Sequence, residues 1–325
     1  MEIAVGPSPG AVAEQMSRPS RFGDRAFEWL TATMALAVVV LVVLVGWQLA
    51  SQSMGPIRKF GFHFLATSTW DPVAEQFGAL PFIYGTIVSS LIALIIAVPL
   101  SIATALYLTE LAPLWMRQPI TSLIEMLAAI PSVILGLWGI FVMIPFLRDY
   151  PFPFLKKYLG WTGLFSGPIY GVSMLAGGII IAIMILPIIT SVSREILRSV
   201  PNLQREAAYA LGATRWEVTR IAVLSYARKG LFGAVILGLG RALGETMAVT
   251  MVIGNTPQIA LSLFKPGYTL ASVIANEFTE ATTDIYLQSL FEIALVLFGI
   301  TILANLVAQM LLKTLGGGAS TRAVQ

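Results

Sequence analysis

The sequence predicts an all-α integral membrane protein with six transmembrane helices. Of its 325 residues, 57% are hydrophobic and only 11% are charged, whereas a soluble domain typically carries about 25% charged residues. The mean hydropathy of +0.82 agrees with this. Six stretches are each long and apolar enough to cross a bilayer, which takes about 20 residues. The predicted spans are residues 29–49, 82–109, 118–147, 171–192, 230–253 and 293–312.

Both ends of the chain are predicted to lie on the inner side of the membrane. Residues 1–28 form a polar tail that is too acidic for the basic n-region of a signal peptide, so the first span is expected to be an uncleaved anchor. With this end inside, the inner segments hold 13 Lys and Arg and the outer segments hold six, as the positive-inside rule requires. Residues 29–313 are then the six-helix transmembrane domain, and residues 314–325 a flexible C-terminal tail.

The composition argues against several kinds of site. The chain has no cysteine and a single histidine, His63, so thiolate chemistry and a histidine-built metal or catalytic site are not expected. The glycines at 238–244 lack the spacing and the strand context of a dinucleotide loop, and no Walker A loop occurs in the sequence. The chain is therefore predicted to bind no cofactor or metal and not to be an enzyme.

The polar segment SREILRSVPNLQREAAYALGATRWEVTRIAVLSYARKG, residues 193–230, predicts two short helices around a break. Pro201 suits a helix start, and Gly212 can adopt the left-handed conformation that ends a helix. Thr214 and Glu217 have the spacing of a capping box that opens the next helix. The helix between Pro201 and Leu211 is expected to lie along the membrane surface.

Two interpretations of this surface helix remain open on sequence. A basic amphipathic segment can rest on anionic headgroups. The small side chains of Ala207 and Ala208 favour a protein docking site instead, because a helix facing lipid would carry larger apolar groups.

The fifth span contains two charged residues, Arg241 and Glu245. A charge at the bilayer centre costs about 2.5–3.5 kcal/mol, and residues four apart meet on one face of a helix. One interpretation is an ion pair that neutralises itself or holds a neighbouring helix. The other is an anion path, because a guanidinium presents planar, bidentate donors to an oxyanion. The carboxylate would keep the anion from being held too tightly, and Thr246 would add a polar contact.

Two smaller expectations concern neighbouring positions. Gly240 and Gly244 are predicted to form a face of small residues for close helix packing. Glu125, in the third span, is expected to pair with Arg117 or with water.

The segment EAAYALGATRWEVTRIAVLSYARKG resembles the EAA loop of permease subunits in ATP-binding-cassette importers. Glu206, Ala207, Ala208 and Gly212 match the family pattern, although its usual proline is replaced by Leu224-Ser225. Two further segments, AAIPSVILGLWGIFV (128–142) and LGLGRALGETMAVTMVIGN (237–255), resemble the phosphate-specific permeases of the PstC type. This resemblance covers about residues 30–312.

The resemblance implies a type I ABC importer permease (MetI-like) core over about residues 82–313, with the first span outside it. The loop 201–215 would be the coupling helix that docks on an ATPase subunit, and Arg241 and Glu245 would fall on the family's charged pair. The implied partners are a second permease of the PstA type, two ATPase subunits of the PstB type that bind ATP and Mg, and a phosphate-binding protein of the PstS type. The setting would be lipid of the bacterial plasma membrane, without nucleic acid.

Three alternatives remain. A permease for sulfate or molybdate would share the EAA loop. An ATP-independent transporter would commonly show inverted repeats, and none is evident in the sequence. A membrane-embedded enzyme would need a constellation of nucleophile, base or metal ligands that the composition does not supply.

Overall fold

The computed structural model describes residues 21–316, which fall into two units at residues 51 and 52. In the first unit the described residues form α2 (Arg21–Gln52), an apolar helix long enough to span a membrane. The helix therefore begins inside the predicted tail 1–28. The remainder of that tail, residues 1–20, and residues 317–325 of the predicted C-terminal tail lie outside the described residues.

The second unit is also helical, which confirms the all-α prediction for the described chain. It contains five candidate membrane spans, and α2 is a sixth. In chain order the spans are Gly23–Gln52, Leu80–Leu111, Ser132–Asp149, Met174–Arg198, Arg215–Leu243 and Asp284–Thr314. Its helices in chain order are α3 (Met54–Phe60), α4 (His63–Ala66), α5 (Leu80–Leu106), the π-helical turn η1 (Tyr107–Leu111), α6 (Leu114–Ala128), α7 (Ser132–Trp138), η2 (Gly139–Met143), α8 (Ile144–Asp149), α9 (Pro151–Leu159), η3 (Gly160–Thr162), α10 (Met174–Arg198), α11 (Asn202–Ala210), α12 (Arg215–Glu217), η4 (Val218–Leu224), α13 (Ser225–Leu243), α14 (Met247–Ile253), α15 (Leu270–Glu277) and α16 (Asp284–Gly316).

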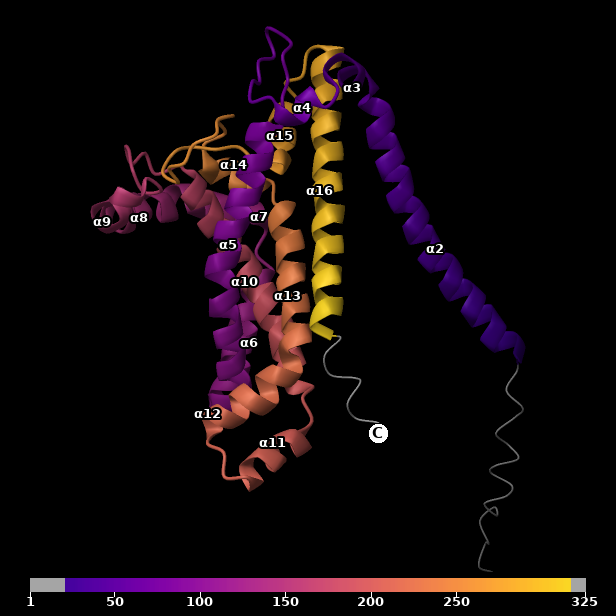
Figure 1. Cartoon of the computed structure of the whole chain (residues 1–325), viewed down its shortest axis with the longest axis vertical. Coiled ribbons are helices and arrows are strands. Elements are labelled where there is room, and N and C mark those ends of the chain that lie inside the picture. The colour runs from indigo at the N-terminus through magenta and orange to yellow at the C-terminus, as the bar shows by residue number, and fades with distance from the viewer. Residues whose placement is uncertain (1–20, 317–325) are drawn as a thin grey trace, which may run out of the picture. The chain divides into compact units, whose positions relative to one another are not determined.

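Helix α10 is the centre of this unit. It packs against α5, α6, α13 and α14, and Figure 1 shows α5, α10, α13 and α16 running along the long axis. Its isoleucines form the core, and Ile180, Ile185 and Ile189 are fully buried. Gly178 lets α5 approach closely, because a Cβ atom at this position would lie 2.5 Å from Ile92 Cγ2.

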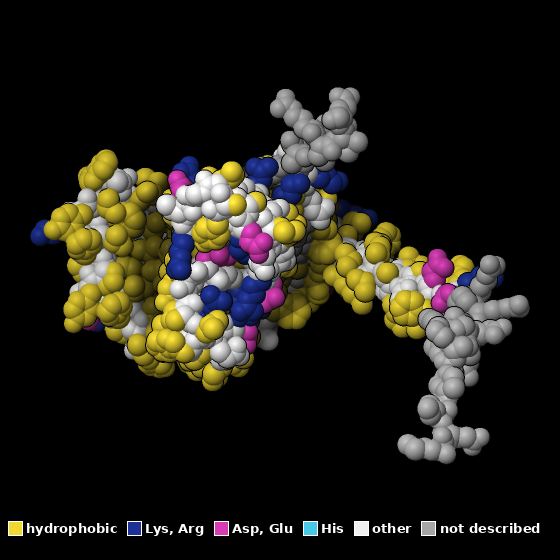
Figure 2. All heavy atoms as spheres, turned by 90° about the horizontal axis from the view of Figure 1, so that it is seen from below, with side chains coloured by type: hydrophobic (Ala, Val, Ile, Leu, Met, Phe, Trp, Pro, Cys, Tyr) yellow, Lys and Arg dark blue, Asp and Glu magenta, His cyan; other side chains and the backbone are white. Residues whose placement is uncertain are grey.

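The two ends of the unit differ. One end, here called the α11 end, carries α11, α12 and the connecting loop, and the opposite end carries α3, α4 and α15 (Figure 1). Figure 2 looks onto the α11 end and shows charged side chains gathered there, while hydrophobic side chains cover much of the flanks.

Two of the predicted spans are broken. The third, predicted over 118–147, splits into α6, which ends at Ala128, and a span that begins at Ser132. Pro131 caps the second helix, and a proline disfavours helical backbone at the residue before it. The fifth, predicted over 230–253, splits into α13 and α14. The expectation that Arg241 and Glu245 share one continuous helix is therefore wrong.

The second break has a local cause. Gly244 is the C-cap of α13, and glycine is the residue that a helix interior accommodates least well apart from proline. Beyond it, Glu245 Oε1 accepts a long hydrogen bond of 3.4 Å from the Ala248 N–H. A carboxylate at this position satisfies an amide that the first turn of α14 would otherwise leave unpaired.

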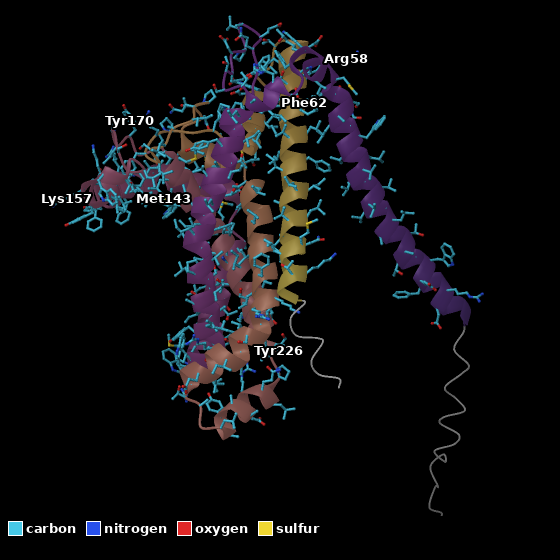
Figure 3. All side chains as sticks on the ribbon, in the orientation of Figure 1. Arg58, Phe62, Met143, Lys157, Tyr170 and Tyr226 are labelled. Atoms are coloured by element: carbon cyan, nitrogen blue, oxygen red, sulfur yellow. The ribbon has the colours of Figure 1, made fainter. Side chains whose placement is uncertain are left out.

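At the opposite end, α8 and α9 project sideways from the upright helices (Figure 1). Phe152 of α9 is buried against the core, whereas Phe154, Tyr158 and Trp161 are exposed on another side. Lys157 Nζ lies 5.5 Å from the centre of the Tyr158 ring, and Figure 3 shows Lys157 standing out from the helices. An exposed aromatic stripe with lysines, directly after the end of a span, is typical of a helix at a membrane–water interface.

Candidate functional site

Arg241 borders a hollow of about 240 Å³ between α6, α7, α10 and α13. It is the charged residue among the side chains that line this hollow. Both helix breaks lie beside it, because Ala128 and Ile130 flank the first break and Arg241 lies just before the second. The lining residues are Leu127, Ala128, Ile130, Leu135, Met184, Ile188 and Arg241. The sequence motif thus supplies a single guanidinium to an otherwise apolar wall.

Arg241 and Glu245 form a loose pair. Arg241 Nη2 lies 3.6 Å from Glu245 Oε2, and the side chains are 49% and 5% exposed, respectively. A tight charge-assisted hydrogen bond would be about 2.7–2.9 Å, so Arg241 retains donors for another acceptor. Glu245 is anchored at the break, whereas Arg241 faces open space. The geometry therefore gives Glu245 a structural role and leaves Arg241 available to an anion.

The face of α13 that carries Gly240 and Gly244 is not covered by other helices of the described chain. A Cβ atom on Gly240 would meet nothing within 4 Å, and one on Gly244 would meet only the Gly240 carbonyl at 3.8 Å. The prediction that these two glycines pack against a neighbouring helix is thus wrong within the described chain. Close packing occurs instead at Gly238, where a Cβ atom would lie 2.6 Å from Ile189 Cδ1.

Thr246 lies in the break next to Glu245. Its carbonyl accepts hydrogen bonds from the Thr250 N–H at 3.0 Å and from the Thr250 hydroxyl at 2.8 Å. Among the described residues, Thr246 is not one of those that line the hollow at Arg241. Its role in substrate contact stays a prediction.

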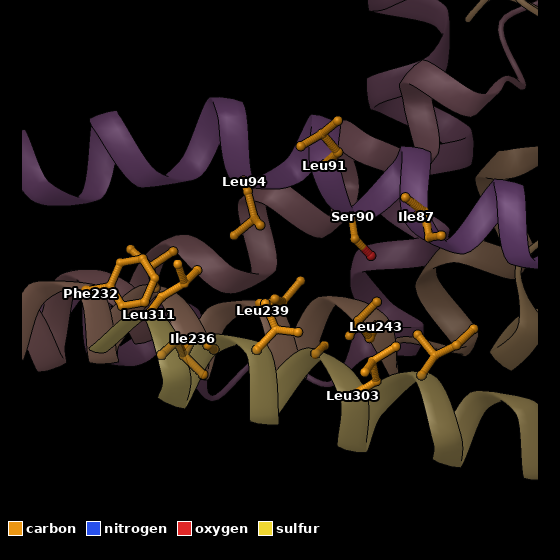
Figure 4. Close-up of a pocket in the computed structure, with 15 residues that line it drawn as sticks. Ile87, Ser90, Leu91, Leu94, Phe232, Ile236, Leu239, Leu243, Leu303 and Leu311 are labelled. Atoms are coloured by element: carbon orange, nitrogen blue, oxygen red, sulfur yellow. The ribbon is translucent and has the colours of Figure 1, made fainter. Parts of the chain in front are cut away.

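A larger hollow of about 540 Å³ lies between α5, α13 and α16 (Figure 4). Ser90 is the polar residue among its apolar lining. Because this lining offers no charge to an anion, the hollow at Arg241 is the candidate site for a charged substrate.

The predicted docking loop has the expected local structure. Gly212 has a φ of +82°, which only glycine adopts without strain, and it ends α11 as predicted. The Thr214 N–H donates to Glu217 Oε2 at 2.8 Å, and the Glu217 N–H donates to Thr214 Oγ1 at 3.4 Å, which completes the capping box.

Helix α11 lies at the surface of this chain. None of its residues is buried, and Glu206 and Ala207 are exposed. A shallow hollow of about 330 Å³ lies beside it, lined by Ala208, Leu211, Gly212, Ala213, Glu217 and Ile221. Leu203 is exposed as well. An amphipathic helix with an uncovered apolar face and small residues beside a hollow suits docking against a protein surface.

Arg205 attaches α11 to the transmembrane helices, a role that no sequence pattern beyond its positive charge indicates. Its Nη2 donates to Glu110 Oε1 at 2.9 Å and to the Leu197 carbonyl at 3.0 Å, and its Nη1 donates to the Val200 carbonyl at 2.6 Å. The side chains of Arg205 and Glu110 are only 17% and 16% exposed. One side chain thus ties α11 to η1 and to the end of α10.

These features are typical of the membrane-spanning subunit of a transporter, with an arginine at broken helices and an uncovered amphipathic helix at one end. Residues 97–316 match the family model described as binding-protein-dependent transport system inner membrane component. The chain is 48% identical over 293 residues to the phosphate transport system permease protein PstC of Mesorhizobium japonicum, covering 89% of this chain and 90% of that one. It is 47% identical to PstC of Haemophilus influenzae, covering 89% and 93%. The chain therefore belongs to the binding-protein-dependent transport permeases, and within them to the PstC phosphate transport permeases.

Solved structures share the fold at low sequence identity. A bacterial ABC transporter involved in import of the acidic polysaccharide alginate matches with a TM-score of 0.56 at 17% identity, covering 89% of this chain and 98% of that one. The alginate transporter in complex with its pentasaccharide-bound periplasmic protein gives a TM-score of 0.58 at 16% identity, covering 89% and 96%. These likenesses confirm the importer permease fold that the resemblance implied.

Proposed function

We propose that this chain is a transmembrane subunit of an ATP-driven importer of inorganic phosphate and forms half of its translocation path. The observation that carries the proposal is Arg241, a half-exposed guanidinium at a hollow where two membrane segments are interrupted. Interrupted helices commonly form substrate sites in transporters. The identity to PstC proteins supports phosphate as the cargo.

The open face of α13 suits a second, homologous permease of the PstA type. Arg241 needs a further wall if the anion is to be enclosed, and Gly240 and Gly244 leave room for one. Phosphate would then pass between the two subunits. The carboxylate of Glu245 would lower the positive potential at Arg241 and so keep the anion from being held too tightly.

Helix α11 is the coupling element of this proposal. Two ATPase subunits of the PstB type would bind ATP and Mg and dock one on each permease, at residues 201–215 in this chain. A phosphate-binding protein of the PstS type would deliver the anion at the opposite end. The α11 end and both termini would lie in the cytoplasm, with the aromatic stripe of α9 at the outer lipid interface of the bacterial plasma membrane.

The test is uptake of labelled phosphate into vesicles that hold the full complex, with and without ATP. We expect uptake to require ATP and to persist in a hundredfold excess of sulfate or molybdate. Equal competition by either oxyanion would favour the alternative of a permease for that anion. Uptake that continues without ATP would favour an ATP-independent transporter.

A further inference from the structure

A second arginine, Arg194, lies between α6 and α10, beyond the hollow at Arg241 and nearer the α11 end. Arg194 follows Ile188 by six residues on α10, which places it about 9 Å further along the helix at a rise of about 1.5 Å per residue. On the facing wall, Glu125 precedes Ala128 by three residues on α6. Both residues therefore lie about one to two turns beyond the hollow, in the seam between α6 and α10.

Arg194 holds this seam closed through one short hydrogen bond and two longer contacts with carboxylates. Its Nη1 donates to Thr121 Oγ1 on α6, and its Nη2 lies 3.5 Å from Glu125 Oε1 and 3.2 Å from Glu195 Oε1. The expectation that Glu125 pairs with Arg117 is wrong, because Arg117 Nε donates instead to the Ala112 carbonyl at 2.9 Å. The space between Thr121, Ile124, Ser191 and Arg194 leaves no room for a water molecule.

The guanidinium of Arg194 is nonetheless incompletely satisfied. Its side chain is only 12% exposed, and its Nε is buried without a hydrogen-bond partner. A buried donor left unpaired costs about 1–3 kcal/mol. The two carboxylates it meets, Glu125 and Glu195, are both more than half exposed, so water weakens their hold. Arg194 therefore has an unused donor and acceptors that an incoming anion can displace.

The arrangement repeats that of Arg241 and Glu245. In each case an arginine lies 3.5–3.6 Å from a glutamate oxygen, too far for a tight bidentate pair. A series of weak, charged positions lets an ion enter and still leave, whereas one strong site would retain it.

We propose that Arg194 is a second anion-binding position of the transport path, on the α11 side of Arg241. This rests on the proposed function. When the seam between α6 and α10 opens toward the space between the two permeases, phosphate oxygens replace Glu125 at the guanidinium and take up the unpaired Nε–H. Glu125 returns when phosphate leaves, which closes the seam.

The competing interpretation is that Arg194 only clamps α6 to α10. The natural absence of cysteine allows the two interpretations to be distinguished. A single cysteine introduced at Ser191 reports whether the seam between α6 and α10 opens and which charge it attracts. In vesicles holding the ATPase, the partner permease and the binding protein, Ser191→Cys would be treated during ATP turnover with an anionic or a cationic methanethiosulfonate reagent of similar size. The ratio of the two modification rates, anionic over cationic, measures the electrostatic potential at the cysteine.

We expect the anionic reagent to react faster, and inorganic phosphate to slow it. Arg194→Gln should lower the anionic-to-cationic ratio several-fold and reduce uptake about tenfold. Glu125→Gln should raise the ratio, which provides a test even if Arg194→Gln fails to fold. The matched control is Arg198→Gln, which removes the same charge from the same helix at a side chain that is 49% exposed. It should change the ratio less than twofold.

The proposal would be overturned if neither reagent modified Ser191→Cys during turnover, or if Arg194→Gln and Glu125→Gln altered thermal stability but left the ratio unchanged. Failure of the proposed function is a separate result. In that case the cysteine-free parent would import no phosphate in the same vesicles.

Discussion

At the scale of single residues, the two charges of the fifth span have different environments and therefore different roles. Glu245 is almost fully buried and accepts a backbone N–H at the start of α14, whereas Arg241 is half-exposed beside the hollow. The carboxylate both supports the helix break and lowers the positive potential at Arg241. Replacing it should affect release of the anion more than its capture.

We therefore predict that Glu245→Gln lowers the maximal rate of phosphate uptake several-fold. The amide oxygen can still accept the Ala248 N–H, so α14 should remain intact, but the uncompensated Arg241 would hold phosphate longer. Initial uptake rates over a range of phosphate concentrations would check this. An unchanged maximal rate would show that the negative charge plays no part in release.

Glycines at two positions give a matched test of packing. Gly136→Ala would place a Cβ atom 2.5 Å from Met251 Sδ and 3.1 Å from Ala248 Cα. Such overpacking typically costs about 1–3 kcal/mol, so the midpoint of thermal unfolding of the purified chain should fall. Gly240→Ala, which meets nothing within 4 Å, should leave the midpoint unchanged or raise it, because alanine favours helix. Equal effects at both positions would contradict the described packing of α7 on α14.

At the scale of elements, α11, the proposed coupling helix, contacts η4 and is tied to other membrane helices by the side chain of Arg205. It buries no residue of its own, and Arg205 reaches η1 and the end of α10 at once. Beside the contact of α11 with η4, Arg205 therefore links α11 directly to two transmembrane helices. This makes Arg205 a positioning residue rather than part of the docking surface.

Arg205→Ala should separate ATP hydrolysis from transport. Docking on the ATPase should persist, since the exposed face of α11 is unchanged, while the phosphate imported per ATP hydrolysed should fall at least several-fold. Both quantities can be measured in one vesicle preparation. The double exchange Arg205→Glu with Glu110→Arg should restore part of the coupling. If Arg205→Ala imported as much phosphate per ATP hydrolysed as the parent, the ion pair of Arg205 with Glu110 would play no part in coupling.

The same elements show what the sequence could and could not predict. The end of α11 at Gly212 and the capping box at Thr214 follow from local backbone preferences, and both are confirmed. The break at Gly244 was missed because long apolar stretches lie on both sides of it, whereas the first break falls at Pro131, a residue type that interrupts helices. The pairing of Arg205 with Glu110 joins residues 95 positions apart, and local sequence patterns do not predict such a contact.

At the scale of the whole molecule, docking of the ATPase subunits on α11 requires the α11 end to face the cytoplasm. The positive-inside rule supports this, since most Lys and Arg outside the spans fall in the segments on that side. Each end of the second unit has a strongly exposed residue suited to labelling. Phe62 is 91% exposed between α3 and α4, and Leu211 is 90% exposed at the end of α11.

Single cysteines at these positions test the orientation in a chain that has none of its own. An impermeant thiol reagent applied to the outside of spheroplasts should label Phe62→Cys. It should label Leu211→Cys only after the membrane is permeabilised. Because the two side chains are equally exposed, a difference in labelling reports on the side of the membrane, and the reverse pattern would invert the proposed topology.

Binding of the transported anion by Arg241 can be tested by phosphate uptake in Arg241 variants. Parent, Arg241→Lys and Arg241→Gln would be compared in vesicles with the full complex, with assembly and basal ATP hydrolysis measured in the same preparations. We predict that Arg241→Gln abolishes uptake while the complex stays assembled. Arg241→Lys should retain a fraction of uptake, because it keeps the charge without the bidentate donors. Uptake by Arg241→Gln close to that of the parent would contradict the account and leave the charged pair a structural feature of the helix break.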